Sequence, residues 1–390
     1  MKQDSPYDVC AASVSELPFD ARVWKESRSL AGAGYRLALL GCSSQVDATA
    51  SRTTEEGIDV TEVPFGKPET RGGILQRIGV MVALSRQVLR TRARIYHSHN
   101  VEIAPAVWLA AKLRRATLIY DAHELYHEPE AAGLRPRIEG FVWAAIERLM
   151  MRSADAVITT NRSRADVLER AYGRDDLVVL GNVPARRDEF EPIDPGYPAG
   201  KRILLYQGII SAEGRAFRET MEALAGLPDD VHFVIIGFAR EERLQMIRDW
   251  ARELGIEERV HLLPPRPFDE LVGTAALADV GLVPIYPSTL NNYLGDTNKI
   301  FEYLMAGIPV VASDLPEIHR VATDGTPRVG EVFDPHSAES VKRAIESVLA
   351  DDDLLAARRR EARRLALEKY NWGIEERKLL ALYDRQKAAA

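Results

Sequence analysis

The chain has 390 residues, of which 46% are hydrophobic and 28% charged, and its formal net charge is −7. This length exceeds one ordinary hydrophobic core and predicts two domains, while the composition excludes an intrinsically disordered chain. The negative net charge provides no general attraction for nucleic acid, so we expect no nucleic-acid partner.

The first half of the chain alternates short apolar runs with amphipathic segments. Predicted strands cover residues 7–14, 35–41, 94–98, 116–122 and 154–160, and predicted helices cover 21–34, 101–114 and 137–152. Such alternation is typical of a parallel sheet with helices on both faces. The two cysteines, Cys10 and Cys42, fall in apolar runs and are expected to be buried free thiols.

The alternation stops over residues 181–200, which contain four prolines and three glycines. We predict an interdomain linker at 185–201, between one domain at 1–184 and another at 202–370. Further strands are predicted at 202–207, 231–237, 260–263, 280–284 and 308–312, and helices at 214–226, 241–254, 299–306, 337–350 and 353–370. The expected architecture is α/β, with two doubly wound Rossmann-like domains facing a central cleft.

Two common nucleotide-binding motifs are missing from the sequence. The only candidate for a glycine-rich fingerprint, residues 32–34, ends a predicted helix and precedes a strand, which is the wrong context for a dinucleotide. No P-loop is found. These absences argue against a dinucleotide-dependent oxidoreductase and against a P-loop kinase. No signal peptide and no apolar stretch of ~20 residues is found, so we expect a cytoplasmic protein.

The segment NNYLGDTNKIFEYLMAGIPVVASD, residues 291–314, predicts a loop, a short helix and a strand. Thr297 or Asn298 is expected to cap the helix, whose N-terminus offers free N–H groups and the positive end of a dipole to an anion. Lys299 adds a full positive charge in the first turn, and Glu302 lies one turn further, within reach of ligand hydroxyls. The alternative is an ordinary capped helix with exposed polar residues.

Residues 301–314 of this segment closely resemble the donor-site signature of the retaining glycosyltransferases of family four, which have the GT-B fold. The resemblance extends more weakly over nearly the whole chain. It implies that Glu302 holds the ribose of a nucleotide. A second family glutamate, eight positions earlier, is replaced here by Leu294, so backbone groups at Gly295 and Asp296, or the Asp296 carboxylate, are the candidates for the sugar contact. It also implies that residues 371–390 cross back to the first domain.

A second segment of the resemblance is YQGIISAEGRAF, residues 206–217. Gly208 ends a strand and permits close approach of a diphosphate. Ile209 stands where the family has an arginine, and Arg215 falls at the position of the family's lysine. Arg215, Lys299 and Arg266 are the cations assigned to the nucleotide site, with Lys299 supplying the missing charge. The alternative for Arg215 is a solvated arginine at a helix start.

The segment LIYDAHELYHE, residues 118–128, contains His123-Glu124-x-x-His127, which matches a zinc-protease pattern. That pattern requires a helix, whereas this one follows a predicted strand, so we expect no metal site. The resemblance implies instead that His123 is the active-site histidine facing the donor sugar or phosphate. A bystander histidine in a loop is the alternative.

Two neighbouring segments supply further candidates for the same site. His97 and His99 are expected to face opposite ways on a strand end, one lining the cleft and the other packing, with Asn100 beside them. The first loop, SVSELPFDAR, lacks the family's glycines. Its side chains Phe19, Asp20 and Arg22 are candidates for an acceptor pocket.

Residues 71–94 contain six arginines and no acidic residue, interspersed with apolar side chains. A basic amphipathic helix of this kind suits the surface of an anionic membrane. The alternative is a domain helix with a solvated face. Peripheral contact with the inner face of the membrane is therefore one expectation for this chain.

The sequence thus predicts a retaining hexosyltransferase that moves a hexose from a nucleotide diphosphate sugar, UDP- or GDP-linked, to a hydroxyl acceptor. The acceptor is a glycan, a lipid-linked molecule or a small molecule. No cofactor beyond the donor is expected, and His123, Arg215 and Lys299 are the expected catalytic residues. The alternatives are a sugar-nucleotide epimerase or hydrolase of the same fold, and a catalytically silent nucleotide-binding subunit.

Overall fold

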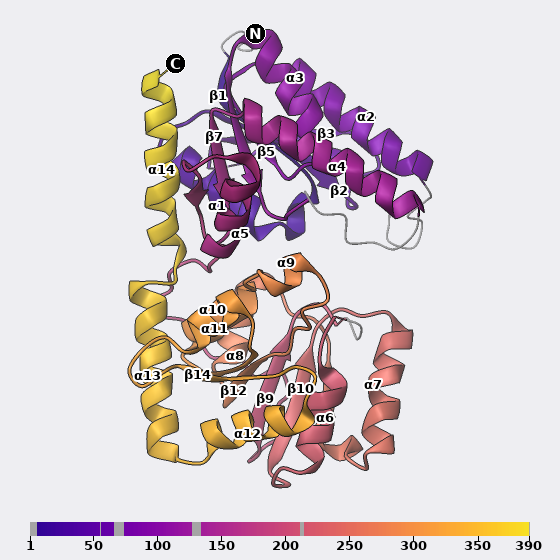
Figure 1. Ribbon diagram of the computed structural model, residues 1–390, viewed down its shortest axis with the longest axis vertical. Coiled ribbons are helices and arrows are strands. Elements are labelled where there is room, and N and C mark those ends of the chain that lie inside the picture. The colour runs from indigo at the N-terminus through magenta and orange to yellow at the C-terminus, as the bar shows by residue number, and fades with distance from the viewer. Residues whose placement is uncertain (1–5, 55, 66–73, 127–133, 211–213, 390) are drawn as a thin grey trace. The chain divides into compact units, whose positions relative to one another are not determined.

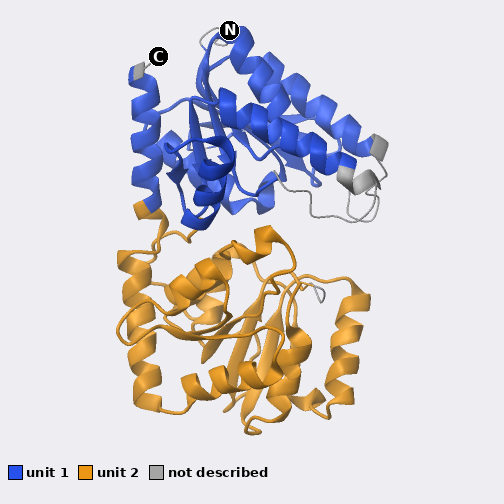
Figure 2. Cartoon of the chain, viewed as in Figure 1, with its two compact units in different colours: residues 1–181, 375–390 blue, residues 182–374 orange. Residues whose placement is uncertain are grey.

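The computed structural model describes residues 6–54, 56–65, 74–126, 134–210 and 214–389. The chain divides into two compact units, one made of residues 1–181 and 375–390 and the other of residues 182–374 (Figure 2). Each unit is one sheet with helices packed on it (Figure 1). Residues 185–201, predicted as a linker, belong to the second unit, where the Ile193 N–H donates to the Gly273 carbonyl at 3.0 Å.

The first unit is built on an eight-stranded sheet with the order β3-β4-β2-β1-β5-β6-β7-β8. Its strands are β1 (Tyr7–Glu16), β2 (Leu37–Ser43), β3 (Ala50–Thr53), β4 (Ile58–Pro64), β5 (Ala93–His99), β6 (Thr117–Ala122), β7 (Ala156–Thr159) and β8 (Val178–Val179). Neighbouring strands are parallel except β3 and β4, which form an antiparallel pair. The prediction missed this edge pair because β3, with the sequence ASRT, is polar and largely exposed.

The helices of the first unit follow most of its strands. They are α1 (Ala21–Gly32), α2 (Ile74–Arg90), α3 (Ala104–Arg114), α4 (Leu134–Ser153) and α5 (Arg162–Tyr172), together with α14 (Trp372–Ala389), which lies in this unit from Glu375 onward. The Asp20 side chain caps α1 by accepting a hydrogen bond from the Val23 N–H at 3.1 Å. Among the described residues, no helix is both long and apolar enough to span a membrane.

The second unit has a fully parallel six-stranded sheet in the order β11-β10-β9-β12-β13-β14. Its strands are β9 (Arg202–Gln207), β10 (Val231–Ile236), β11 (Val260–Leu263), β12 (Val280–Val283), β13 (Val310–Ser313) and β14 (Gly330–Phe333). Its helices are α6 (Phe217–Ala225), α7 (Glu241–Glu253), α8 (Leu271–Ala275), α9 (Leu290–Tyr293), α10 (Asn298–Ala306), α11 (Pro316–Ala322), α12 (Ala338–Leu349) and α13 (Asp352–Glu368). Separate hydrophobic clusters fill the two faces of the sheet.

Each sheet has one point where the strand order reverses. In the first unit it lies between β1 and β5, and in the second between β9 and β12. Ligands of such sheets bind outside the carboxyl ends of the strands at this point. We therefore expect functional residues just after β5 and β6 in the first unit and just after β9 in the second.

The two cysteines confirm the expectation of buried free thiols. Cys10 lies in β1 and Cys42 in β2, both with no exposed surface. Burial raises the pKa of each thiol to about 12, so neither is a thiolate near neutral pH.

Candidate active site

A cavity of about 360 Å³ lies at the carboxyl end of β9 in the second unit. It is lined by Gln207, Gly208, Leu271, Asp296, Thr297, Asn298, Lys299 and Glu302. Six of these eight residues were singled out from the sequence, and the structure brings them together around one space. Gln207 and Leu271 were not, although Gln207 lies beside Gly208 in the segment 206–217 that carries part of the resemblance.

The N-terminus of α10 opens onto this cavity without a side-chain cap. Thr297 is the residue before the helix and Asn298 is its first residue, yet neither caps it with a side chain, which corrects that expectation. The Thr297 hydroxyl instead accepts a hydrogen bond from Lys299 Nζ at 3.3 Å. The Ile300 N–H donates to the Thr297 carbonyl at 3.2 Å, and the N–H groups of Asn298 and Lys299 remain the candidates for an anion in the cavity.

Glu302 is one of two carboxylates that line the cavity, beside Asp296, and only 5% of its surface is exposed. Gln207 Nε2 donates to Glu302 Oε2 at 2.8 Å and holds the side chain in place. Gln207 itself is 1% exposed, and its Oε1 has no hydrogen-bond partner among the described residues. An unpaired buried amide oxygen at a cavity wall is energetically unfavourable and favours a ligand that donates a hydrogen bond there.

Two glycines bring the backbone close to the cavity. Gly208 has a φ of +133°, and a Cβ there would lie 3.3 Å from Lys299 Cε and Nζ. A Cβ on Gly237, which follows β10, would lie 1.7 Å from the Gly208 carbonyl oxygen. Side chains at either position would therefore displace the backbone or the lysine. This close approach is consistent with the prediction that Gly208 leaves room for a diphosphate.

The cations Lys299 and Arg215 both contact Tyr206. Lys299 Nζ lies 5.2 Å from the centre of the Tyr206 ring, and the Arg215 Nε–H donates to the Tyr206 hydroxyl at 3.3 Å. Arg215 Nη1 also donates to the Gly214 carbonyl at 2.7 Å. Arg215 does not line the cavity itself, although it contacts the same tyrosine as Lys299.

Two other residues predicted for the nucleotide site, Gly295 and Arg266, lie outside the cavity lining. Gly295 is buried beside Leu294, which ends α9 and is 8% exposed. Arg266 donates to the Pro195 carbonyl at 3.1 Å and lies 3.9 Å from Glu270. Its guanidinium thus joins neighbouring loops of the second unit and does not line the cavity.

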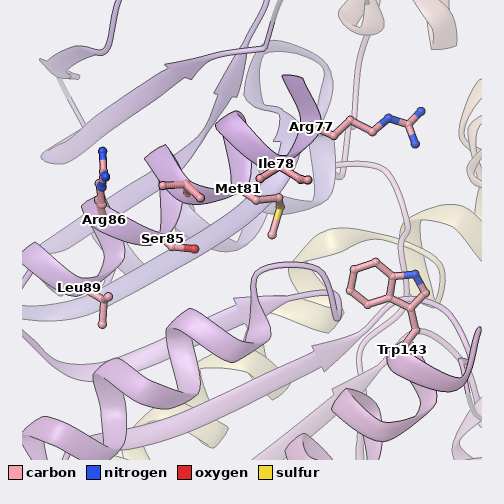
Figure 3. A pocket seen from close by; sticks show the side chains of 8 residues that line it. Arg77, Ile78, Met81, Ser85, Arg86, Leu89 and Trp143 are labelled. Atoms are coloured by element: carbon pink, nitrogen blue, oxygen red, sulfur yellow. The ribbon is translucent and has the colours of Figure 1, made fainter. Parts of the chain in front are cut away.

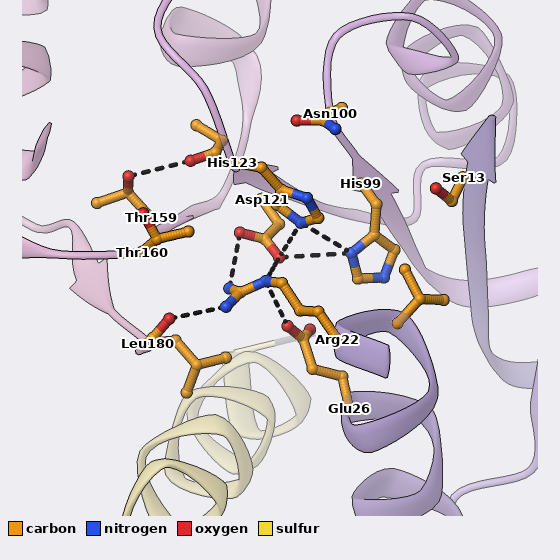
Figure 4. Close-up of polar contacts among 12 residues, drawn as sticks. Ser13, Arg22, Glu26, His99, Asn100, Asp121, His123, Thr159, Thr160 and Leu180 are labelled. Carbon is orange, nitrogen blue, oxygen red and sulfur yellow. Dashed lines mark hydrogen bonds and ion pairs between the residues drawn. The ribbon is translucent and has the colours of Figure 1, made fainter. Parts of the chain in front are cut away.

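The first unit contains a buried cluster of charged groups at the ends of β5 and β6 (Figure 4). Arg22 Nε and Nη2 donate to the two carboxylate oxygens of Asp121 at 2.9 and 3.0 Å, and Nη1 donates to the Leu180 carbonyl at 2.8 Å. Arg22 and Asp121 are 3% and 0% exposed. The expectation that Arg22 shapes an acceptor pocket is therefore wrong for its buried side chain, while Phe19 is 70% exposed.

His123 lies at the accessible side of this cluster, with 17% of its side chain exposed. Its Nε2–H donates to Asp121 Oδ2 at 2.8 Å, which leaves Nδ1 facing away from the carboxylate. Arg164 donates to the His123 carbonyl and holds the loop. Residues 123–126 form no helix, as the zinc-protease pattern would require, and His127 lies outside the described residues.

The expectation that His97 and His99 face opposite ways is wrong. Their rings stack with centroids 4.2 Å apart, and both side chains are buried. Residues two apart in a strand share a face, since side chains alternate with a period of two. His97 Nδ1 lies 2.8 Å from the Tyr383 hydroxyl of α14, and His99 Nδ1 lies 3.4 Å from Asp121 Oδ2. Asn100, next to them, has a φ of +63°.

Glu26 completes the cluster and was not predicted. Its carboxyl lies 3.1 Å from Arg22 Nε and 4.0 Å from His97 Nε2. Burial raises the pKa of Glu26 well above its usual range. Burial acts in the same direction on Asp121, but Arg22 and the histidines hold the pKa of Asp121 well below its usual range. Asp121 therefore ionises before Glu26 as the pH rises.

Ligand atoms of Glu26, His97, His99 and Asp121 lie within 4.8 Å of one another, close enough for a metal ion. However, the Arg22 Nε–H lies at 2.9 Å from Asp121 and 3.1 Å from Glu26, so the guanidinium already occupies the position of a cation. The cluster is best described as an arginine-centred anchor for the loop that carries His123.

Acid is expected to destabilise the first unit through His97 and His99. Burial lowers the pKa of His97 well below its usual range and also lowers that of His99. The unfolded chain therefore binds protons at these positions before the folded chain does. Stability should fall as pH drops below the unfolded value of about 6.5, by up to ~1.4 kcal/mol per pH unit for each histidine.

The measurement compares the native sequence with His97→Gln by urea unfolding between about pH 7.5 and about pH 5.5. The stability advantage of the native sequence should shrink as pH falls, because only the native sequence has His97 to protonate. Glu26 is present in both proteins, so its opposite pH dependence largely cancels in the difference. An advantage that stays constant over this range contradicts the prediction.

Each of the two units matches a known family of protein domains. Residues 20–182 match the family model described as "Glycosyl transferase 4-like domain", and residues 188–365 match the model "Glycosyl transferases group 1". The chain belongs to glycosyltransferase family four. The predicted family is thereby confirmed, and the protein is an enzyme of the transferase class.

Curated relatives of this glycosyltransferase cover most of its length. A D-inositol 3-phosphate glycosyltransferase of Xylanimonas cellulosilytica is 25% identical over 92% of this chain and 89% of its own. The protein of the same name from Mycolicibacterium smegmatis is 28% identical over 78% of this chain and 72% of its own.

Solved structures show the same fold. Sucrose-phosphate synthase from Thermosynechococcus elongatus has a TM-score of 0.80 at 16% identity and covers 98% of this chain and 99% of its own. HepE from Anabaena, solved with UDP and glucose, has a TM-score of 0.70 at 15% identity and covers 97% of this chain and 100% of its own. These neighbours confirm the predicted GT-B class with its two Rossmann-like units.

Proposed function

We propose that this glycosyltransferase moves a hexose from a nucleotide diphosphate sugar to a hydroxyl acceptor with retention of anomeric configuration. The observation that carries the proposal is the cavity after β9. It combines a buried carboxylate at Glu302, an uncapped helix N-terminus at α10 and a lysine in that helix's first turn. A ribose hydroxyl suits the carboxylate, and a diphosphate suits the helix start.

The charges of the cavity support this orientation of the donor. Lys299 is 9% exposed and reaches toward Gly208, where its Cε and Nζ would lie 3.3 Å from a Cβ. A diphosphate at Gly208 would therefore meet the lysine and the N–H groups of α10 together. Arg215, held on Tyr206, adds a second positive charge on the tyrosine that Lys299 also contacts. From the family resemblance we assign His123 to the transferred sugar or phosphate.

In the proposed reaction the bond between the anomeric carbon and the diphosphate oxygen breaks. A new bond to the acceptor oxygen forms on the same face, and the acceptor proton passes to the departing diphosphate. No protein nucleophile is needed for this sequence of events. The residues of the second unit contribute by positioning the donor and stabilising charge on the leaving group. Inositol phosphates are the first acceptors to test, given the names of the curated relatives.

The test is a thermal-shift screen against UDP-, GDP- and TDP-sugars, followed by transfer assays with the ligand that binds. A donor at a hundredfold excess over its dissociation constant should stabilise the protein by ~2.7 kcal/mol. The anomeric configuration of the product, read by NMR coupling constants, then tests retention. An inverted product would refute the retaining mechanism while leaving the donor site intact.

Two other outcomes would replace the proposal. Rapid turnover of the donor without any acceptor would indicate an epimerase or a hydrolase. Donor binding with no transfer to any acceptor would indicate a silent nucleotide-binding subunit, for which Leu294 and Ile209 are the relevant departures from the family pattern. If no nucleotide sugar binds, the assignment of the cavity itself is wrong.

A further inference from the structure

Helix α2 of the first unit has apolar side chains on two of its sides. α2 buries Val80, Leu84 and Val88 against the unit, each with 6% or less exposed. Ile78 and Val82 lie on another side of the same helix and are 50% and 44% exposed. A helix needs only one apolar stripe to pack on a domain, so the second stripe requires another explanation.

This second stripe borders a groove of about 450 Å³ between α2 and α4 (Figure 3). Met81 and Leu89 of α2 and Trp143 of α4 form its apolar lining, and Arg77 and Arg86 lie at its edges. The groove is thus an apolar recess flanked by cations, on the opposite side of α2 from the unit's core.

Exposed apolar side chains continue beyond the groove. Phe141 and Val142 of α4 are 64% and 50% exposed, and Ile138 is 55% exposed. On α3, which packs against both α2 and α4, Leu113 is 69% exposed. Half of the large apolar residues that are exposed in the described parts of the chain lie on these three helices. Such concentration marks an interaction surface.

The arginines of α2 form no ion pair with a carboxylate in the described parts of the chain. Arg77, Arg86 and Arg90 are exposed, and none of them forms an ion pair with a described residue. Other exposed arginines do pair, as Arg162 does with Asp166 and Arg252 with Asp249. The absence of acidic residues from 71 to 94 is notable in a chain of net charge −7. The positive charge is therefore local to this surface.

We propose that the α2–α4 face binds the surface of a lipid bilayer that carries anionic head groups. We define this face by Arg77, Ile78, Val82, Arg86, Arg90, Phe141 and Val142. The apolar side chains would enter the boundary between head groups and acyl chains, while the arginines contact phosphates. A chain of net negative charge is repelled by an anionic membrane, so it needs such a local positive surface to bind.

The charge of this face fits a membrane better than another copy of the chain. Two α2–α4 faces brought together would oppose unpaired arginines on both sides, which is electrostatically unfavourable. An anionic bilayer satisfies the arginines and the apolar groups at once. The inference is independent of the donor cavity, so binding to vesicles tests it without any transfer reaction.

The test is flotation of the full chain with vesicles of phosphatidylcholine alone or with about 30% phosphatidylglycerol. Binding should occur on the anionic vesicles only and weaken as salt is added. The variant Arg77→Gln/Arg86→Gln/Arg90→Gln should bind on the order of a hundredfold more weakly, at about fivefold per arginine. The control Arg162→Gln/Arg248→Gln/Arg252→Gln removes the same charge elsewhere and should bind as the native chain does.

The apolar contribution is tested by Phe141→Ser/Val142→Ser, which should weaken binding at least about tenfold. Its control is Phe238→Ser/Phe268→Ser, which alters exposed phenylalanines of the second unit. Melting temperatures equal to that of the native chain establish that the variants fold. The proposal is overturned by equal binding to neutral vesicles, by equal losses in variant and control, or by a dimer that Phe141→Ser/Val142→Ser dissociates.

Discussion

Replacing Arg22 with methionine is expected to lower the free energy of unfolding by about 3–5 kcal/mol. The substitution removes three hydrogen bonds, two to the Asp121 carboxylate and one to the Leu180 carbonyl. Methionine fills a similar volume, so it should leave no cavity. The expected loss of stability arises because the buried Asp121 carboxylate loses its positively charged partner. Asp121 is fully buried and, among the described residues, would keep His123 and His99 at 2.8 and 3.4 Å and the Glu26 carboxyl, which cannot replace the lost positive charge.

Urea unfolding followed by circular dichroism measures this loss. The matched control is Arg162→Met in the same unit, because Arg162 also pairs with two carboxylates but at the surface. Exposed pairs contribute roughly 0–1 kcal/mol, so the control should unfold close to the native chain. Equal stability of the two variants would contradict the assignment of Arg22 as the charge that holds Asp121.

The double variant Arg22→Met/Asp121→Leu separates charge from packing. If the loss comes from an uncompensated buried carboxylate, removing that carboxylate as well should restore much of the stability. The same variant should lower transfer activity, since His123 Nε2 loses the acceptor that orients its ring. Recovery of stability without recovery of activity would identify Asp121 as a positioning residue for His123.

The architecture of the chain could be predicted from its sequence because most of its strands are buried on both faces. β2 and β10, for example, are buried at every position and read as continuous apolar runs. Edge strands that are short or polar, such as β3 and β14, form no continuous apolar run and were therefore not predicted. The predicted linker was inferred from prolines, but its apolar residues Phe190 and Tyr197 pack on the core of the second unit.

The candidate site was predicted only where its residues are close in sequence. Asp296 to Glu302 form one loop and one helix, so a single motif points to them. The Arg22–Asp121 pair spans 99 residues, and nothing near Arg22 in the sequence indicates its partner. Arg266 was also assigned from the sequence, and in the structure its guanidinium contacts the Pro195 carbonyl of a neighbouring loop, a contact that the sequence does not indicate.

In the second unit, a substitution of Glu302 tests the proposed donor site most directly. Glu302→Gln should weaken donor binding by roughly ten- to a hundredfold, equivalent to about 1.5–3 kcal/mol. Glutamine has the same shape and keeps an oxygen for the Gln207 Nε2 donor at 2.8 Å, so the cavity should keep its form. Calorimetric titration with the nucleotide sugar measures the loss. Glu361→Gln, a buried glutamate outside the cavity, is the control and should leave donor affinity unchanged.

Truncated ligands distinguish the role of Glu302 from that of Lys299. If Glu302 binds the ribose, Glu302→Gln should weaken the free nucleoside and the full donor by the same factor. If Lys299 binds the diphosphate, Lys299→Met should weaken the donor by roughly ten- to a hundredfold and leave the nucleoside unaffected. Loss of nucleoside binding in Lys299→Met would instead mean that the lysine only holds Thr297 and the start of α10 in place. The two variants together thus test the orientation of the donor along the cavity.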